Sequence, residues 1–289
     1  MSILAKLEKL LNDNVNFSDL LLKANEPFKY RLPDGYHPLD DEKLSDSDVQ
    51  AFVLAQFNNG YNLEKAIQDN GGHLDFALTF NGVRFRCNTF HFNGNASYGV
   101  SLRKLNNVIP LLDTLALPAL AKSFANRATG LVLVTGATGS GKSTSLASMI
   151  NHVNRTRNGH IITIEDPIEY VHENILSSVT QREVGIDTKS FAMGLKASLR
   201  EDPDIILIGE IRDRVTCEAA LAAAETGHLV FATLHTSSAA KSIERIMDMF
   251  HGDEKNAVRS VLSSVLVGIV SQVLMPSKDK QSRVLAAEV

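Results

Sequence analysis

The 289-residue sequence contains no tryptophan and only two cysteines, and aromatic residues make up 6% of it. Cys87 and Cys217 are isolated and no Cys-x-x-Cys motif occurs. This argues against a disulfide framework or a cysteine zinc site and fits a reducing compartment. Acidic residues outnumber basic ones, 33 to 29, giving a net charge of −4. Because there is neither a basic excess nor a basic run, we expect no direct nucleic-acid partner.

Long apolar runs are also missing. The most apolar late segment, residues 258–275, is interrupted by Arg259, Gln272 and several serines. It therefore predicts a buried amphipathic helix and not a membrane span. Residues 3–11 place apolar side chains on one helical face, which favours a helix packed on its own domain over a membrane-surface anchor. With no secretory signal visible, we expect a cytoplasmic protein without a transmembrane segment.

A complete phosphate-binding loop is the clearest motif present. It follows the apolar run 131–134 and precedes a helical stretch that begins near Lys142. In such a strand–loop–helix arrangement, backbone N–H groups and a helix N-terminus point at one anion, the lysine reaches the β- and γ-phosphates, and the next hydroxyl ligates Mg²⁺. We therefore predict that the chain binds ATP and Mg²⁺. The predicted nucleotide-binding residues are Gly136, Ala137, Thr138, Gly139, Ser140, Gly141, Lys142, Ser143 and Thr144.

The first 106 residues differ in pattern from the rest. Short alternating runs at 75–80 and 83–88 flank Asn81-Gly82, which is a strong hairpin signal. Helical patterns at 46–57 and 62–69 complete a small α+β domain. Residues 107–125 carry Pro110 and Pro118, and we interpret them as a linker with one short helix.

Residues 126–289 alternate apolar strands with helices. Strands are expected at 131–135, 161–165, 205–209 and 229–234, and helices near 142–154, 190–199, 214–226 and 238–249. Continuous apolar strands between helices indicate a parallel sheet covered on both faces, hence an α/β domain.

Acidic residues follow two of these strands, where an α/β sheet places its ligand site. Glu165 and Asp166 end the first, and buried acids need a cationic partner. Glu210 follows the strand at 205–209, a Walker B-like pattern in which the final carboxylate can orient or deprotonate the attacking water. Histidines 228 and 235 stand at the two ends of the last strand. Taken alone, each is better explained as a structural histidine than as a zinc ligand, because no third ligand occurs at metal spacing.

These residues, in this order, resemble the secretion-ATPase superfamily, most closely its type IV pilus retraction branch. The similarity runs from about Phe17 to the C-terminus. It covers the P-loop, the segment 163–172 that looks like the family's aspartate box, the segment 199–204 leading into Walker B, and the histidine box at 223–236.

The resemblance implies a hexameric ring of RecA-like motor domains with a PAS-like N-terminal domain, acting on an inner-membrane pilus or secretion platform. It also implies the site roles. Glu210 would be the catalytic base, Glu165 would organise Mg²⁺ and water together with Ser143, and His228 and His235 would sense the nucleotide. Arg103 would complete the site from the N-terminal domain, with Arg84 and Arg86 as the family's paired arginines.

Arg200 and Arg212 flank the Walker B strand and could supply a cationic group instead, although ion pairs with Glu201 or Asp213 are the simpler explanation. The sequence departs from the family in two places. Segment 91–97 lacks an arginine usual in that loop, and the relatives continue beyond Val289 into helices that carry a motif needed for retraction.

Three alternatives to a retraction motor remain. A related type II or type IV secretion ATPase would drive export or pilus biogenesis, but the assembly branch typically carries a tetracysteine insert that is missing here. A DNA-pumping ATPase would need a basic, aromatic-bearing loop. A scaffold that binds nucleotide without hydrolysing it would lack the base.

Overall fold

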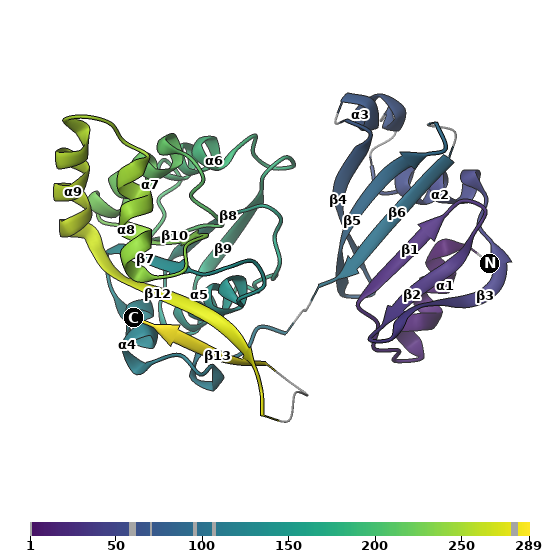
Figure 1. The fold of residues 1–289 in the computed structure, drawn as a ribbon, viewed down its shortest axis with the longest axis horizontal. Helices are drawn as coiled ribbons and strands as arrows, with labels where there is room; N and C mark the ends of the chain where they lie inside the picture. Colours follow the sequence, from purple (N-terminus) through teal and green to yellow (C-terminus); the bar gives the residue numbers. More distant parts are fainter. Residues whose placement is uncertain (1, 58–61, 70, 95–96, 106–107, 279–282) are drawn as a thin grey trace. The chain divides into compact units, whose positions relative to one another are not determined.

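The computed structural model describes residues 2–57, 62–69, 71–94, 97–105, 108–278 and 283–289. It divides into two compact units, residues 1–107 and 108–289, each with its own sheet (Figure 1). Asn95 and Ala96 belong to the segment 91–97, which lacks the arginine usual in the family, and they lie outside the described residues.

The first unit is an antiparallel sheet of six strands with helices packed on one side. Its strand order is β3-β2-β1-β6-β5-β4. The strands are β1 (Asp19–Lys23), β2 (Pro27–Leu32), β3 (Gly35–Lys43), β4 (His73–Phe80), β5 (Val83–Phe92) and β6 (Ser97–Lys104). The helices are α1 (Ile3–Asn12), α2 (Asp46–Leu54) and α3 (Leu63–Asp69). The predicted α+β composition and the helix at residues 3–11 are confirmed.

Alternation along the strands explains this packing. Phe85 and Cys87 on β5 are fully buried and join a single core with Leu102 and the apolar faces of the three helices. Arg86 and Asn88, one residue out of phase, face away from that core, as the period of two in a strand requires. Asn81 and Gly82 both adopt positive φ, 48° and 74°, in the predicted turn between β4 and β5.

The second unit contains a seven-stranded sheet in the order β13-β12-β7-β11-β10-β8-β9. All neighbours are parallel except β12 and β13. The strands are β7 (Gly130–Thr135), β8 (His160–Glu165), β9 (Ser178–Glu183), β10 (Ile205–Ile208), β11 (Leu229–Leu234), β12 (Leu266–Pro276) and β13 (Arg283–Glu288). The four strands predicted from apolar runs are β7, β8, β10 and β11. They form the centre of this sheet and confirm the α/β prediction.

Helices cover both faces because the central strands are apolar on both faces. On β7, Leu131 and Leu133 join one core, whereas Val132 and Val134 join the other. The first core includes α6 (Phe191–Ser198), α7 (Arg214–Glu225), α8 (Ala239–Asp248) and α9 (Glu254–Val265). The second includes α5 (Lys142–Thr156), α4 (Ala119–Ser123) and the short turns η1 (Leu112–Thr114) and η2 (Phe124–Asn126).

Two sequence predictions need correction. The helix expected over 258–275 ends at Val265, and the chain continues as β12, which pairs with β7 in parallel. The segment 107–125, predicted as a linker, is mostly part of a domain instead. From residue 108 onward it belongs to the second unit, and Leu112, Leu117 and Phe124 are buried in the core around α5.

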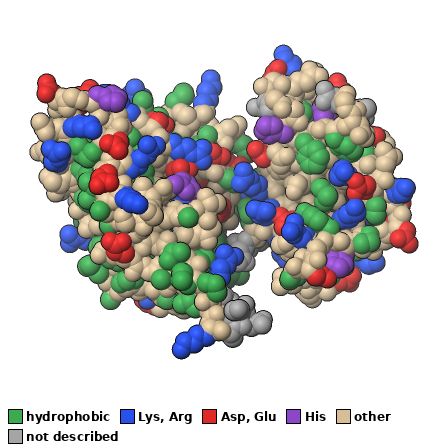
Figure 2. Space-filling view, in the orientation of Figure 1, with side chains coloured by type: hydrophobic (Ala, Val, Ile, Leu, Met, Phe, Trp, Pro, Cys, Tyr) green, Lys and Arg blue, Asp and Glu red, His purple; other side chains and the backbone are tan. Residues whose placement is uncertain are grey.

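The visible surface carries mixed charge. On the face that Figure 2 shows, acidic and basic side chains are interspersed on both units, and apolar side chains gather near β12 and β13. Val273, Met275 and Val284 are about half exposed there. Among the described residues, no helix is both long and apolar enough to cross a membrane.

Candidate functional site

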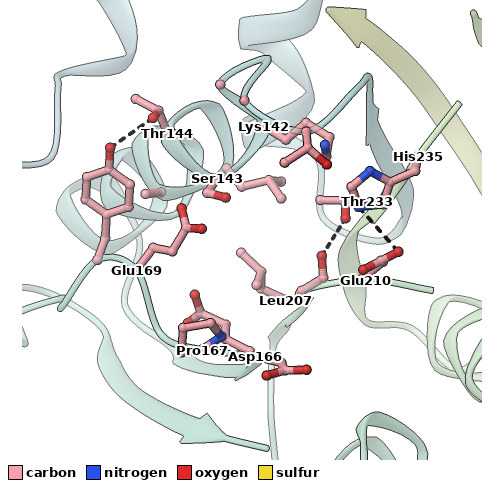
Figure 3. A pocket seen from close by; sticks show the side chains of 18 of the residues that line it. Lys142, Ser143, Thr144, Asp166, Pro167, Glu169, Leu207, Glu210, Thr233 and His235 are labelled. Carbon is pink, nitrogen blue, oxygen red and sulfur yellow. Dashed lines mark hydrogen bonds and ion pairs between the residues drawn. The ribbon is translucent and has the colours of Figure 1, made fainter. Parts of the chain in front are cut away.

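A cavity of about 530 Å³ opens at the carboxyl edge of the second sheet. It is lined by the first turn of α5 and by the segments that follow β8, β10 and β11 (Figure 3). This is the edge at which parallel α/β sheets bind ligands. The cavity therefore brings together the P-loop and three strand ends that the sequence singled out.

The P-loop has the backbone geometry of an anion cradle. Gly136, Gly139 and Gly141 adopt φ values of 146°, 77° and 89°, which side chains rarely tolerate. Gly141 also precedes α5, and no side chain caps that helix. By contrast, α6, α7 and α8 are capped by Ser190, Asp213 and Ser238. The first N–H groups of α5 thus have no side-chain acceptor and point into the loop.

Lys142 lies inside this loop. Its Nζ donates hydrogen bonds to the carbonyl oxygens of Gly136 at 2.8 Å and Ala137 at 3.0 Å, and the residue is 8% exposed. Burial lowers the pKa of the ammonium group, while the nearby carboxylates of Glu210 and Glu169 act in the opposite direction. A fixed cation in a loop of N–H donors is suited to phosphate oxygens.

Strand β12 braces the loop from outside. The side-chain amide of Gln272 donates to the carbonyl of Ser140 at 2.9 Å, 132 residues away in sequence. A Cβ on Gly136 would collide with the Gln272 carbonyl and the Ser140 side chain. Glycine is therefore required at position 136 by close approach as well as by its φ.

Acidic side chains face the loop across the cavity. Glu165, at the end of β8, accepts hydrogen bonds from the hydroxyl of Thr163 at 2.6 Å and the amide of Gln181 at 3.1 Å. Burial, more than the neighbouring carboxylates, raises the pKa of Glu165 to about 7. Asp166 and Glu169 follow in the segment 166–177, which we call the acidic loop, and both line the cavity.

The acidic loop is held against the P-loop helix at two points. The hydroxyls of Thr144 and Tyr170 are 2.9 Å apart. At the other end of α5, the buried side chain of Asn154 donates to the Glu173 carbonyl and accepts from the N–H groups of Ile175 and Ser177. Helix α5 thus positions both the phosphate loop and the carboxylates opposite it.

Glu210 lies between the side chains of Arg212 and His235. Arg212 donates from Nε to one carboxylate oxygen at 2.7 Å, and His235 Nε2 is 3.4 Å from the other (Figure 3 labels Glu210 and His235). Arg212 also has Nη1 3.7 Å from Asp166. Of the two acids after β8 that were expected to meet a cation, Asp166 does so through this contact, whereas the hydrogen bonds of Glu165 come from Thr163 and Gln181. The competing ion pairs suggested by the sequence do not form, since Asp213 caps α7 and Glu201 pairs with Arg182.

Most of the predicted site residues meet in this cavity. Thr138, Gly139, Gly141, Lys142, Ser143, Thr144, Glu165, Glu210 and His235 line it. Gly136, Ala137 and Ser140 belong to the same loop but are not among the lining residues, and neither is His228. His228 precedes β11 and His235 follows it, so a strand of six residues, about 20 Å long, separates them. His228 instead contacts the Ala223 carbonyl and the Thr226 hydroxyl at the end of α7.

Arg103 belongs to the first unit, on the sheet face opposite the helices. Its Nε donates to Asp19 at 2.9 Å, and the side chain is 70% exposed. With Arg86 and Asp19, it lines a shallow hollow on that unit. The structure thus leaves the guanidinium accessible to an anionic ligand.

Sequence reasoning missed Gln272 and Tyr170, and it gave Arg212 only a secondary place. Of these three residues, only Arg212 could have been found from its position in the sequence. It comes two residues after the Walker B acid Glu210 and therefore lies at the same edge of the sheet. Gln272 belongs to a strand mistaken for a helix.

The donor set suits Mg²⁺. This ion prefers oxygen ligands and is commonly held by one or two carboxylates together with substrate phosphates. The Ser143 hydroxyl and the Glu165 carboxylate line one cavity with the P-loop. Among the described residues, no group of three or more His, Cys, Asp or Glu side chains is arranged to hold a metal.

Comparison with known proteins agrees with this geometry. The family model described as "Type II/IV secretion system protein" matches residues 62–288. The type IV pilus retraction ATPase PilT of Pseudomonas aeruginosa is 44% identical over 275 residues, which cover 94% of this chain and 78% of that protein. A twitching motility protein of Neisseria gonorrhoeae is 46% identical over 248 residues, or 86% of this chain. The match covers 65% of that protein, slightly under two thirds.

A solved structure of the pilus retraction motor PilT with bound ADP superposes with a TM-score of 0.91. It is 45% identical in sequence, and the match covers 100% of this chain and 82% of the other.

Proposed function

This chain belongs to the type II/IV secretion system protein family, and we propose that it is an ATPase and the motor that retracts type IV pili. The observation that carries the proposal is a single cavity that combines an uncapped P-loop helix, Lys142 and the carboxylates of Glu165 and Glu210. Relatives named for pilus retraction and twitching motility support the biological role.

The site residues divide the work of hydrolysis. The P-loop N–H groups and Lys142 hold the phosphates of ATP. Ser143 and Glu165 would hold Mg²⁺, which neutralises charge on the β- and γ-phosphates when bound. Glu210 accepts the proton of the attacking water, and His235, beside it, contacts the same carboxylate. Thr144 supports the loop through Tyr170.

We further propose that the protein works in the cytoplasm as a homohexameric ring on a membrane platform protein of the pilus machine. This follows from the resemblance to retraction ATPases. It gives the Arg103 side chain, exposed on the first unit, a role in completing a nucleotide site.

A related secretion ATPase is the second candidate, favoured by the description of the matching family, which includes both type II and type IV secretion. Such a protein would use the same hydrolytic site and differ in the apparatus that it drives.

Phosphate release by the full chain tests the enzymatic part. We expect turnover with Mg²⁺ and loss of turnover with EDTA. Lys142→Ala should lose both nucleotide binding and turnover, and Arg259→Ala, an exposed substitution on α9, serves as the control. Normal turnover in Lys142→Ala would contradict the proposed site.

Genetic replacement tests the biological part. In a piliated bacterium that lacks its retraction ATPase, the chain should restore twitching and pilus shortening, and the Lys142→Ala variant should not. Rescue of a secretion-ATPase mutant without rescue of twitching would favour the second candidate. Sedimentation with and without nucleotide tests the ring, and a monomer with full turnover would contradict it.

A further inference from the structure

Arg212 joins the ends of two neighbouring strands at the cavity. Its Nε lies 2.7 Å from Oε2 of Glu210, and its Nη1 lies 3.7 Å from Oδ2 of Asp166. Glu210 comes after β10 and Asp166 comes after β8, and these strands pair in parallel. A single guanidinium group therefore contacts carboxylates that follow two different strands, with a hydrogen bond to Glu210 and a longer ion pair to Asp166.

The two partners differ in exposure. The Glu210 side chain is 18% exposed, whereas that of Arg212 is 59% exposed. Ile211 between them is buried, and its N–H donates to the Thr233 carbonyl, so the backbone that carries both residues is tied to β11. The backbone thus fixes the position of the Glu210 Cα, and the hydrogen bond from Arg212 sets the orientation of the Glu210 carboxylate.

The two oxygens of Glu210 have different partners. Oε2 accepts a charge-assisted hydrogen bond of ordinary length from Arg212. Oε1 is 3.4 Å from His235 Nε2, which is longer than a normal N–H···O hydrogen bond. Oε1 is therefore the oxygen that remains available to accept a proton.

We propose that Arg212 is the positioning residue for Glu210, an inference that rests on the proposed ATPase function. In the step concerned, a water proton passes to Oε1 while the water oxygen bonds to the γ-phosphorus. The bond from that phosphorus to the β–γ bridging oxygen breaks, and ADP leaves with the electron pair. Arg212 transfers no proton and acts only by holding Oε2.

Two other roles for Arg212, a purely structural ion pair and a direct contact with the γ-phosphate, predict different kinetics. An ion pair with a partner this exposed contributes little to stability. If the pair of Arg212 and Glu210 had only a structural role, Arg212→Ala would therefore leave turnover unchanged. An arginine that contacts the γ-phosphate directly would accelerate the reaction independently of Glu210. A double-mutant cycle separates these roles, because residues that act through each other are not additive.

The experiment compares Arg212→Ala, Arg212→Lys, Glu210→Gln and the double variant Glu210→Gln/Arg212→Ala. Arg212→Ala should lower kcat about 10- to 100-fold, by analogy with the loss seen when the hydrogen-bonded partner that orients a metal ligand is removed. KM and the affinity for a fluorescent ADP analogue should stay near the wild-type values. Arg212→Lys keeps the charge but not the fork of donors, so it should recover part of kcat. The double variant should be no slower than Glu210→Gln.

Arg214→Ala is the matched control. Arg214 is two residues further on and pairs with Glu218 and Glu254, none of which lines the cavity, so its kcat should be unchanged. Unchanged kcat in Arg212→Ala, or additive losses in the double variant, would overturn the inference while leaving the ATPase function intact. Absence of turnover in the wild-type chain would instead contradict the proposed function.

Discussion

The hydroxyl groups of Thr144 and Tyr170 lie 2.9 Å apart and link the first turn of the P-loop helix to the acidic loop. Thr144 directly follows Ser143, the proposed Mg²⁺ ligand, and Tyr170 directly follows Glu169, which lines the same cavity. One hydrogen bond thus joins the segment that holds the phosphates to the segment that faces them.

Removing this hydrogen bond should lower turnover, because the acidic loop would no longer be held against the first turn of the P-loop helix. We expect Tyr170→Phe and Thr144→Val each to destabilise the protein by about 0.5–1.5 kcal/mol, the usual value for one hydrogen bond. The double variant should cost little more than either single one, because each change removes the same contact. Urea denaturation and kcat of all three variants provide the measurements. Fully additive losses would show that the two hydroxyls do not depend on each other.

Glu165 should make stability depend on pH. Its pKa rises from 4.5 to about 7 on folding, mainly because the carboxyl is buried. The folded state then holds the proton more tightly than the unfolded state. Its contribution to the unfolding free energy therefore falls as the pH increases from 4.5 to 7, by at most about 1.4 kcal/mol per pH unit.

Glu165→Gln removes this titration, and the amide oxygen can still accept from Thr163 and Gln181. The stability of the variant relative to the wild type should therefore increase between pH 4.5 and 7 and level off above pH 7. Urea denaturation at pH 5, 6, 7 and 8 without nucleotide or Mg²⁺ measures the difference. Glu225→Gln, at the exposed end of α7, is the control. A difference that stays constant over this range would exclude the buried acid as the cause.

The boundary of the second unit can be tested with fragments. Residues 108–289 should fold and bind nucleotide. Residues 126–289 lack Leu112, Leu117 and Phe124, which are 4–6% exposed in the core beside α5. Full burial of each such side chain contributes about 1.5–3 kcal/mol. We therefore expect the shorter fragment to melt at a lower temperature or aggregate. Equal melting temperatures would restore the interpretation of 107–125 as a linker.

Arg103 should affect turnover more than stability. Its ion pair with Asp19 is mostly exposed on the arginine side, so Arg103→Ala should change the unfolding free energy by no more than about 1 kcal/mol. If the guanidinium completes the nucleotide site, turnover should fall by about 10³–10⁵ while nucleotide affinity changes little. Asp19→Asn is the matched control because it breaks the pair and keeps the guanidinium. Equal losses of turnover in Arg103→Ala and Asp19→Asn would show that the ion pair has a structural role and that the guanidinium does not act on the nucleotide.

Local patterns predicted the centre of the second sheet, because every central strand is a short apolar run followed by a polar turn. The same patterns identified the P-loop and the acids after β8 and β10, since these follow directly in sequence. The similarity to pilus retraction ATPases, inferred from four boxes in order, is confirmed by the relatives.

The same patterns failed where long-range pairing decides the structure. Residues 258–275 read as one amphipathic segment, yet only the part up to Val265 is helical. Beyond it, Gly268 allows β12 to lie directly against the ring of Phe124, where a Cβ would collide. No periodicity in the sequence reveals that contact. A short apolar run is compatible with strand or helix until its neighbour is known.

Histidines 228 and 235 show a related limit. Both belong to one motif, but a strand between them sends the side chains to opposite edges of the sheet, and only His235 reaches the cavity. Motif membership alone did not reveal this separation.

The hydrogen bond from Gln272 to Ser140 also has a consequence for folding during translation. Translation proceeds from the N-terminus, so β7 and the P-loop are synthesised before the strands that flank them in the sheet. Both neighbours of β7 in the sheet, β11 and β12, are synthesised later, and the side chain that steadies the loop comes 132 residues after it. A nascent chain therefore cannot form the braced phosphate loop until β12 has left the ribosome. Chains cut short before β12 would lack this brace on the phosphate loop.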